Sequence, residues 1–259
     1  VDRVFEASRQ FHGLPIETKM SLELNHLHRG YIPINTSKDV NSKFENIENP
    51  NQSASFMMMR EDTHEDPSIF LSGPNQWPSL EGFRETLETY HRSMKELGFK
   101  LMKLAVLSFG AEPDEILDAF HTPTTWLRLL HYPPIESNKN ILRARAHADI
   151  NLITLLVGAE EGGLEVQNKD DEWIQIKPNS NSIVCNIGDM MQLITEGNLK
   201  STPHRVVEYS ANDSKSRYSM PFFLHPSPEV VLKSVFNEND EGVLAHDFLE
   251  ERIKAIKLY

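Results

Sequence analysis

The chain has 259 residues, of which 39% are hydrophobic, and its 38 acidic and 26 basic residues give a net charge of −12. An acidic chain repels phosphate backbones, so nucleic acid is a poor partner, and a single cysteine rules out a disulfide framework within the chain. No apolar run approaches the ~20 residues that span a bilayer, and no signal peptide is visible. We therefore expect a cytoplasmic protein that binds neither nucleic acid nor membrane.

The first part of the chain predicts helices. Residues 1–20 show helical spacing of apolar residues, and a second helix is expected to start near Pro15. Residues 34–55 are rich in Asn, Ser and Glu and predict a long surface loop, and residues 55–59 predict a short strand. Residues 79–109 form the strongest pattern, an amphipathic helix with one core face. The members of this apolar stripe are Leu80, Phe83, Leu87, Tyr90, Met94, Leu97, Leu101, Leu104 and Leu107.

After a further short helix at 113–120, the sequence pattern changes to short apolar runs separated by turn residues. The expected strands are 126–132, 144–146, 152–157, 164–167, 173–176, 182–187, 204–209 and 218–224. Cys185 falls in one of these runs and is expected to be buried. Eight short strands favour a sandwich, jelly roll or barrel, and a helix over 243–256 ends the chain. We expect a mainly β protein with flanking helices.

We expect one domain over residues 1–259. It has a mostly helical part (1–121), a β core (122–226) and a C-terminal segment with its helix (227–259).

His147 and Asp149 lie two residues apart, which places both side chains on one face of a strand. An imidazole and a carboxylate on one face can converge on a metal ion. His204, at the start of a later apolar run, is the best third ligand. Two histidines and one carboxylate form the facial triad of non-haem iron(II) oxygenases, which leaves coordination positions open.

Arg217 and Ser219 are also two residues apart in an expected strand. The planar guanidinium group of arginine can grip a carboxylate with two hydrogen bonds, and serine adds a hydroxyl donor. Together they form a seat for a dicarboxylate whose other end could reach the metal.

The ordered set of motifs resembles the 2-oxoglutarate/iron(II)-dependent dioxygenases of the isopenicillin N synthase-like group. The motifs are ARAHADINLITLL (144–156), GLEV (163–166), NIGD (186–189), STPHRV (201–206) and RYSMPFF (217–223). The resemblance is close over residues 125–226 and looser in the N-terminal helices.

This resemblance implies a double-stranded β-helix, or jelly-roll, core packed against the N-terminal helices and a C-terminal helix. It implies iron(II) at His147, Asp149 and His204, and 2-oxoglutarate at Arg217 and Ser219. Tyr132 lies where family members place a tyrosine that helps to hold the co-substrate carboxylate. Dioxygen is the oxidant, with ascorbate a candidate reductant, and the expected reaction is oxidation, chiefly hydroxylation, of a small organic substrate.

Three residues are candidate substrate contacts. Arg128 shares a strand face with Tyr132, Asn151 follows the metal segment closely, and Met58 belongs to a run of three methionines that could line a substrate entrance or simply pack in the core. Desaturation and ring closure on the same scaffold remain open alternatives to hydroxylation.

Two other functions remain open: an isopenicillin N synthase-like oxidase that does not use 2-oxoglutarate, and a non-catalytic metal-binding jelly roll. The chain departs from the family pattern in lacking the usual initial strand, which suggests that its natural N-terminus is missing. It also has Ala148 where the group often has threonine.

Overall fold

The computed structural model describes residues 1–36, 51–110, 120–134, 142–157, 162–177, 179, 182–207 and 215–255. Within these residues, three helices precede the main β block: α1 (Asp2–His12), α2 (Ile16–Met20) and α3 (Phe83–Ser108). Pro15 is the N-terminal cap of α2, as its position in the sequence predicted. The short helix predicted at 113–120 falls almost wholly outside the described residues.

The larger sheet has seven strands and contains the N-terminal strands as well as half of the β core. Its members are β1 (Gly30–Ile32), β2 (Ala54–Met58), β3 (Thr125–Tyr132), β5 (Ile153–Val157), β8 (Ile183–Ile187), β10 (Arg217–Ser219) and β11 (Pro221–Leu224). The order is β1-β2-β3-β11-β5-β8, and β10 also pairs with β3. The expected strand at 218–224 is therefore two strands, with Met220 between them.

The smaller sheet has four strands in the order β4-β9-β6-β7. These are β4 (Leu142–His147), β9 (His204–Val207), β6 (Leu164–Gln167) and β7 (Trp173–Gln175). The remaining elements are α5 (Asp189–Ile194), β12 (Val231–Leu232), β13 (Val243–Leu244) and α6 (Ala245–Ala255). All pairings within the two large sheets are antiparallel, and the mainly β architecture with flanking helices is as predicted.

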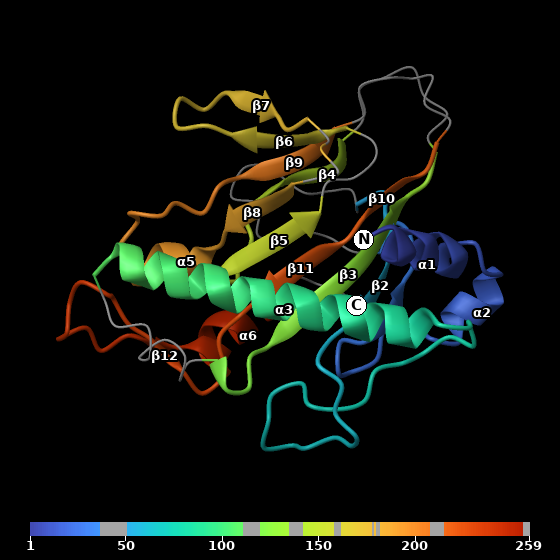
Figure 1. Ribbon diagram of the computed structural model, residues 1–259, viewed down its shortest axis with the longest axis horizontal. Coiled ribbons are helices and arrows are strands. Elements are labelled where there is room, and N and C mark those ends of the chain that lie inside the picture. Colours follow the sequence, from blue (N-terminus) through green and yellow to red (C-terminus); the bar gives the residue numbers. More distant parts are fainter. Residues whose placement is uncertain are drawn as a thin grey trace.

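Helix α3 crosses the outer face of the larger sheet, over β11 and β5 (Figure 1). Gly98 permits this approach, because a β-carbon at that position would lie 2.8 Å from a methyl group of Leu224. Helix α1 lies beside α3 and contacts β3 and β10. The helices thus cover one face of the larger sheet, and the opposite face is left for the smaller sheet.

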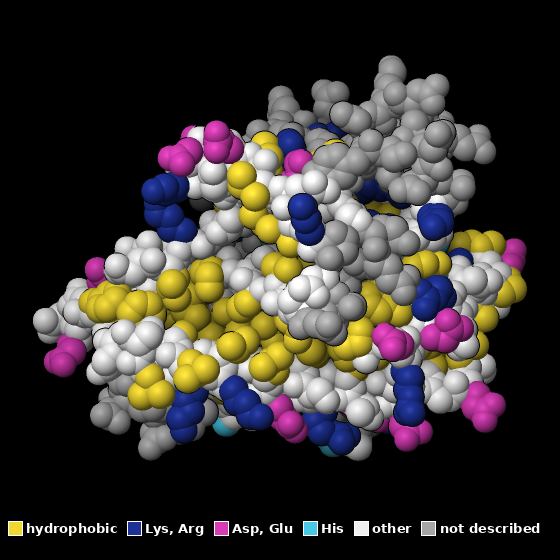
Figure 2. Space-filling model, turned by 45° about the horizontal axis from the view of Figure 1, so that its top comes forward, with side chains coloured by type: hydrophobic (Ala, Val, Ile, Leu, Met, Phe, Trp, Pro, Cys, Tyr) yellow, Lys and Arg dark blue, Asp and Glu magenta, His cyan; other side chains and the backbone are white. Residues whose placement is uncertain are grey.

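The predicted core face of α3 is correct only in its first half. Leu104 and Leu107 are 62% and 50% exposed, whereas Met102 and Val106 are buried. The helix buries residues four apart from Met94 onward, and the leucine stripe drifts to the neighbouring face. Hydrophobic side chains are also exposed more widely, and Figure 2 shows them as a broad band across one face of the molecule.

Cys185 is exposed, which contradicts the expectation of a buried thiol. Its strand, β8, lies at the edge of the larger sheet, so its outward-facing residues lack a neighbouring strand on one side. An apolar run cannot distinguish an edge strand from a central one. Among the described residues, no helix has the length and apolar character needed to cross a bilayer.

Two histidines, the buried His12 and the partly buried His131, join α1 to the larger sheet. Nε2 of His12 lies 2.9 Å from the carbonyl oxygen of Leu129, and its ring centroid is 5.0 Å from that of His131. His131 stacks on Tyr218 of β10 and lies 2.9 Å from the hydroxyl of Ser216. Burial is the main cause that lowers the pKa of His12 to about 3 and that of His131 to about 4, and each neighbouring positive charge lowers them further.

These histidines predict an acid-sensitive fold. Their folded pKa values lie below the unfolded value near 6.5, so the unfolded chain binds more protons and stability is lost as the pH falls below about 6.5. For His12 alone we expect a loss of about 2 kcal/mol in unfolding free energy between pH 7 and pH 5. Denaturant unfolding of wild type and His12→Gln at both pH values measures this. Replacing the exposed His26 is the control, and an equal pH dependence in wild type and His12→Gln would contradict the prediction.

Candidate active site

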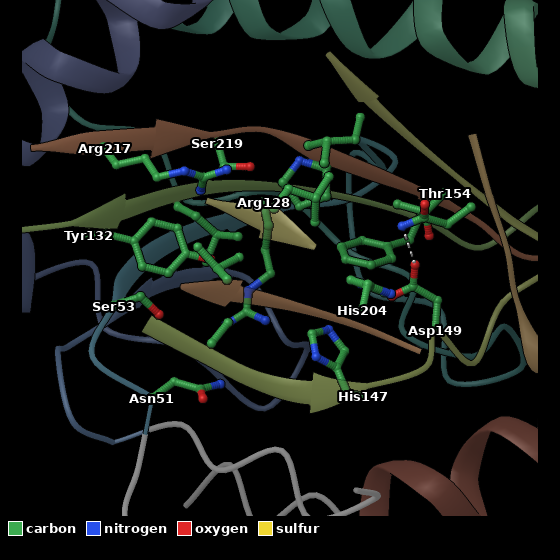
Figure 3. A pocket seen from close by; sticks show the side chains of 18 residues that line it. Asn51, Ser53, Arg128, Tyr132, His147, Asp149, Thr154, His204, Arg217 and Ser219 are labelled. Carbon is green, nitrogen blue, oxygen red and sulfur yellow. Dashed lines mark hydrogen bonds and ion pairs between the residues drawn. The ribbon is translucent and has the colours of Figure 1, made fainter. Parts of the chain in front are cut away.

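A half-open cavity lies between the two sheets and contains about 640 Å³ of space free of atoms, part of it open to solvent. The larger sheet contributes residues of β3, β5, β8, β10 and β11 to its wall, and the smaller sheet contributes residues of β4, β6 and β9. In Figure 3, Arg217 and Tyr132 lie at one end, and His147, Asp149 and His204 lie at the other.

His147 and His204 are direct neighbours across the smaller sheet. They are register partners of β4 and β9, and their ring centroids lie 4.3 Å apart. Nδ1 of His147 lies 2.7 Å from the carbonyl oxygen of Arg145, and Nδ1 of His204 lies 3.2 Å from that of Thr202. Because a carbonyl oxygen can only accept, each Nδ1 carries the proton. Nε2 of both rings is then the unprotonated nitrogen, as metal ligation requires.

Asp149 completes a cluster in which one ligand atom from each of the three residues lies within 4.8 Å of the others. It was expected on a strand, but β4 ends at His147, and Asp149 lies in the loop that follows. Its carboxylate is buried, with Oδ1 3.8 Å from Nε2 of His204. Two imidazole nitrogens and one carboxylate oxygen suit a non-haem iron(II) ion and leave further coordination positions for other ligands.

Arg217 and Ser219 share the cavity-facing side of β10, as their spacing predicted. Both are buried, and Arg217 is the register partner of Tyr132 on β3. The guanidinium carbon lies 5.2 Å from the centroid of the Tyr132 ring, and Nε donates to the carbonyl oxygen of Gly162. These contacts hold the positive charge of Arg217 at the end of the cavity away from the histidines, and Ser219 adds a hydroxyl group to the same strand face (Figure 3).

Arg128 lies in the middle of the cavity, between Tyr132 and His147 (Figure 3). Its guanidinium donates to the hydroxyl of Ser55 from Nε at 3.3 Å and from Nη2 at 3.2 Å. Asn51 and Ser53 line the wall next to it. The centre of the cavity is therefore polar and positively charged.

The other two predicted substrate contacts do not reach the cavity wall. Met58 is 1% exposed and belongs to the main hydrophobic core. Asn151 is also 1% exposed, and its amide donates to the carbonyl oxygen of Ile153 and to the hydroxyl of Thr154. The structure thus gives no support to a substrate-binding role for either side chain.

Four polar cavity residues were missed from the sequence: Asn51, Ser53, Thr154 and Asn186. Asn51 and Ser53 fall in the segment that was predicted as a surface loop, yet they are 8% and 4% exposed. Their polar surroundings in the sequence offer no signal of burial. Asn186 does have a signal, because it is an amide within an otherwise apolar strand, and buried polar groups need a partner.

The loop that carries Asp149 is packed against the turn into α5. Gly188 makes this possible, since a β-carbon there would lie 2.0 Å from the carbonyl oxygen of Asn151. We expect Gly188→Ala to lower the unfolding free energy by about 1–3 kcal/mol, as overpacking typically does. Denaturant titration measures this unfolding free energy. Gly13→Ala is the control, because Gly13 lies at a helix end where the dihedral angles suit alanine. Unchanged stability in Gly188→Ala would mean that the loop can move aside.

Comparisons with known proteins bear directly on this site. Residues 123–226 match the model of the 2OG-Fe(II) oxygenase superfamily, and residues 1–80 match that of the non-haem dioxygenase N-terminal region named for morphine synthesis. A 2-oxoglutarate-dependent dioxygenase of Didymella fabae is 33% identical over 251 residues, covering 90% of this chain and 73% of the relative. The chain belongs to the 2-oxoglutarate/iron(II)-dependent dioxygenase family.

Solved structures of the same family are also similar to this chain. A 2OG-Fe(II) oxygenase family protein from Caulobacter crescentus is 32% identical with a TM-score of 0.86, covering 98% of this chain and 85% of that one. A full-length Neurospora crassa protein, solved in complex with alpha-KG, is 29% identical with a TM-score of 0.85, covering 98% and 82%. The predicted jelly-roll core is therefore confirmed. The dioxygenase uses iron(II), dioxygen and 2-oxoglutarate, and it couples oxidative decarboxylation of 2-oxoglutarate to oxidation of a small organic substrate.

Proposed function

We propose that His147, Asp149 and His204 hold the iron(II) of this dioxygenase. The observation that carries the proposal is the pair of Nδ1–carbonyl hydrogen bonds, which fix both imidazoles with Nε2 as the ligating nitrogen. The ligand atoms of the three residues are close enough together to share one ion. A set of three protein ligands favours a catalytic metal over a closed structural one.

Arg217, Ser219 and Tyr132 bind the carboxylate of 2-oxoglutarate that is remote from the metal. The guanidinium group and the serine hydroxyl are donors on one strand face, and the Tyr132 ring supports the guanidinium from the neighbouring strand. When bound, iron(II) would activate dioxygen, which is the oxidant, and 2-oxoglutarate would supply two of the four electrons that reduce it, the other two coming from the substrate C–H bond. The residues of the chain bind and orient the co-substrate in the cavity between the sheets.

Arg128 binds the substrate. Its guanidinium group is held by Ser55 in the centre of the cavity, beside Asn51 and Ser53. It lies between the residues proposed to bind iron and those proposed to bind 2-oxoglutarate. A cation in that position selects a small organic molecule with a carboxylate or another acidic oxygen, and the net charge of −12 favours such a molecule over nucleic acid. We expect hydroxylation at a carbon near this acidic group.

A substrate panel tests this assignment. Small organic acids and their neutral amides are compared for succinate released in step with product, in wild type and in Arg128→Met. The proposal predicts coupled turnover with acids in wild type and a loss of the preference for acids over amides in Arg128→Met. Equal turnover of acids and amides by wild type would contradict the role of Arg128.

A further inference from the structure

The two oxygens of the Asp149 carboxylate face different partners. Oδ1 lies 3.8 Å from Nε2 of His204, within the cluster of potential metal ligands. Oδ2 accepts a hydrogen bond from Nδ2 of Asn186 at 3.4 Å. One oxygen of the carboxylate therefore faces the potential metal site, and the other is held by Asn186.

Asn186 is fixed in this position by its strand and by its burial. It is 8% exposed and is the register partner of Thr154 on β5. The residues that follow it bind the Asp149 loop through the backbone, because the amide of Asp189 donates to the carbonyl of Asp149 at 2.8 Å and that of Gly188 donates to Leu152 at 3.0 Å. One continuous segment thus holds both the main chain and the carboxylate of Asp149.

We propose that Asn186 is a positioning residue that keeps Asp149 ligating through Oδ1 alone. The inference rests on the proposed role of Asp149 as an iron ligand. A carboxylate that ligates through both oxygens occupies two coordination positions, and this would remove one of the positions that the co-substrate and dioxygen require. The amide of Asn186 opposes this rotation because it donates to Oδ2, and it carries no charge that could compete with the metal.

The alternative is that Asn186 only satisfies its own hydrogen-bonding needs inside the protein. A purely structural role would affect folding without changing how a bound metal is coordinated. Coordination by cobalt(II), whose visible spectrum depends on ligand number and geometry, separates the two roles without requiring catalysis.

The experiment titrates cobalt(II) into wild type, Asn186→Leu and Asn186→Gln, with unfolding of the metal-free proteins measured in parallel. We expect Asn186→Leu to weaken cobalt binding about tenfold or more and to alter the visible spectrum, as loss of an outer-shell partner does. Asn186→Gln keeps the amide and should restore the affinity in part. Cys185→Ala, which removes an exposed side chain from the same strand, should match wild type in both affinity and spectrum.

A His147→Ala variant separates the two possible failures. If His147→Ala loses cobalt binding while Asn186→Leu keeps wild-type affinity and spectrum, the role of Asn186 is overturned and the metal site stands. If His147→Ala binds cobalt as wild type does, the metal-site assignment falls, and the inference falls with it.

Discussion

Replacing Asp149 with alanine is expected to lower 2-oxoglutarate turnover by at least about a hundredfold, since even the outer partners of metal ligands contribute tenfold to a hundredfold. The substitution removes the single carboxylate from the ligand cluster and leaves two neutral imidazoles. Iron(II) binding should weaken in parallel. Succinate formation at saturating iron and 2-oxoglutarate measures turnover, and calorimetric titration with iron(II) under anaerobic conditions measures binding.

Asp170→Ala is the matched control, because this carboxylate lies exposed in the turn between β6 and β7. It should keep wild-type turnover and iron affinity. A folded Asp149→Ala protein that retains substantial succinate formation would show that Asp149 is not an iron ligand.

Arg217→Ala is expected to raise the 2-oxoglutarate concentration needed for half-maximal turnover by about tenfold to a hundredfold. A hydrogen bond to a charged group contributes about 1.5–3 kcal/mol, and each ~1.4 kcal/mol corresponds to a factor of ten. The proposed metal ligands lie at the other end of the cavity, so iron(II) affinity should change little (Figure 3). Initial rates across a 2-oxoglutarate series give the half-saturation value.

Arg205→Gln provides the control for charge. Arg205 also lies on a strand of the β core, but its guanidinium pairs with Glu165 at 2.6 Å and stacks on Trp173 at 4.1 Å. It is not among the residues that line the cavity in the described part of the chain. If Arg205→Gln raised the half-saturation concentration as much as Arg217→Ala, the effect would reflect net charge, and specific binding at Arg217 would be contradicted.

The parts of the site that could be predicted from the sequence share a simple geometry. Arg217 and Ser219 lie two residues apart on strand β10, so their common face follows from the two-residue period of a strand. Their pairing with Tyr132 depends on the register of β10 and β3, which spacing alone does not give. The place of Tyr132 near the co-substrate was implied by the resemblance to the family, whereas His204 was chosen from its position at the start of an apolar run.

The parts that could not be predicted depend on tertiary context. Asn51 and Ser53 become cavity residues because the fold packs their polar segment against the cavity, which hydropathy does not reveal. Cys185 is exposed because β8 is an edge strand, and Leu104 is exposed because the helix buries an adjacent face. The single-domain organisation remains a prediction.

The most direct test of the account is anaerobic titration of the iron(II)-loaded protein with 2-oxoglutarate, followed by visible absorption in wild type and Arg217→Ala. The account predicts a weak metal-to-ligand charge-transfer band that saturates in wild type and needs a much higher co-substrate concentration in Arg217→Ala. Absence of the band in wild type with iron demonstrably bound would contradict the assignment of metal and co-substrate to one cavity.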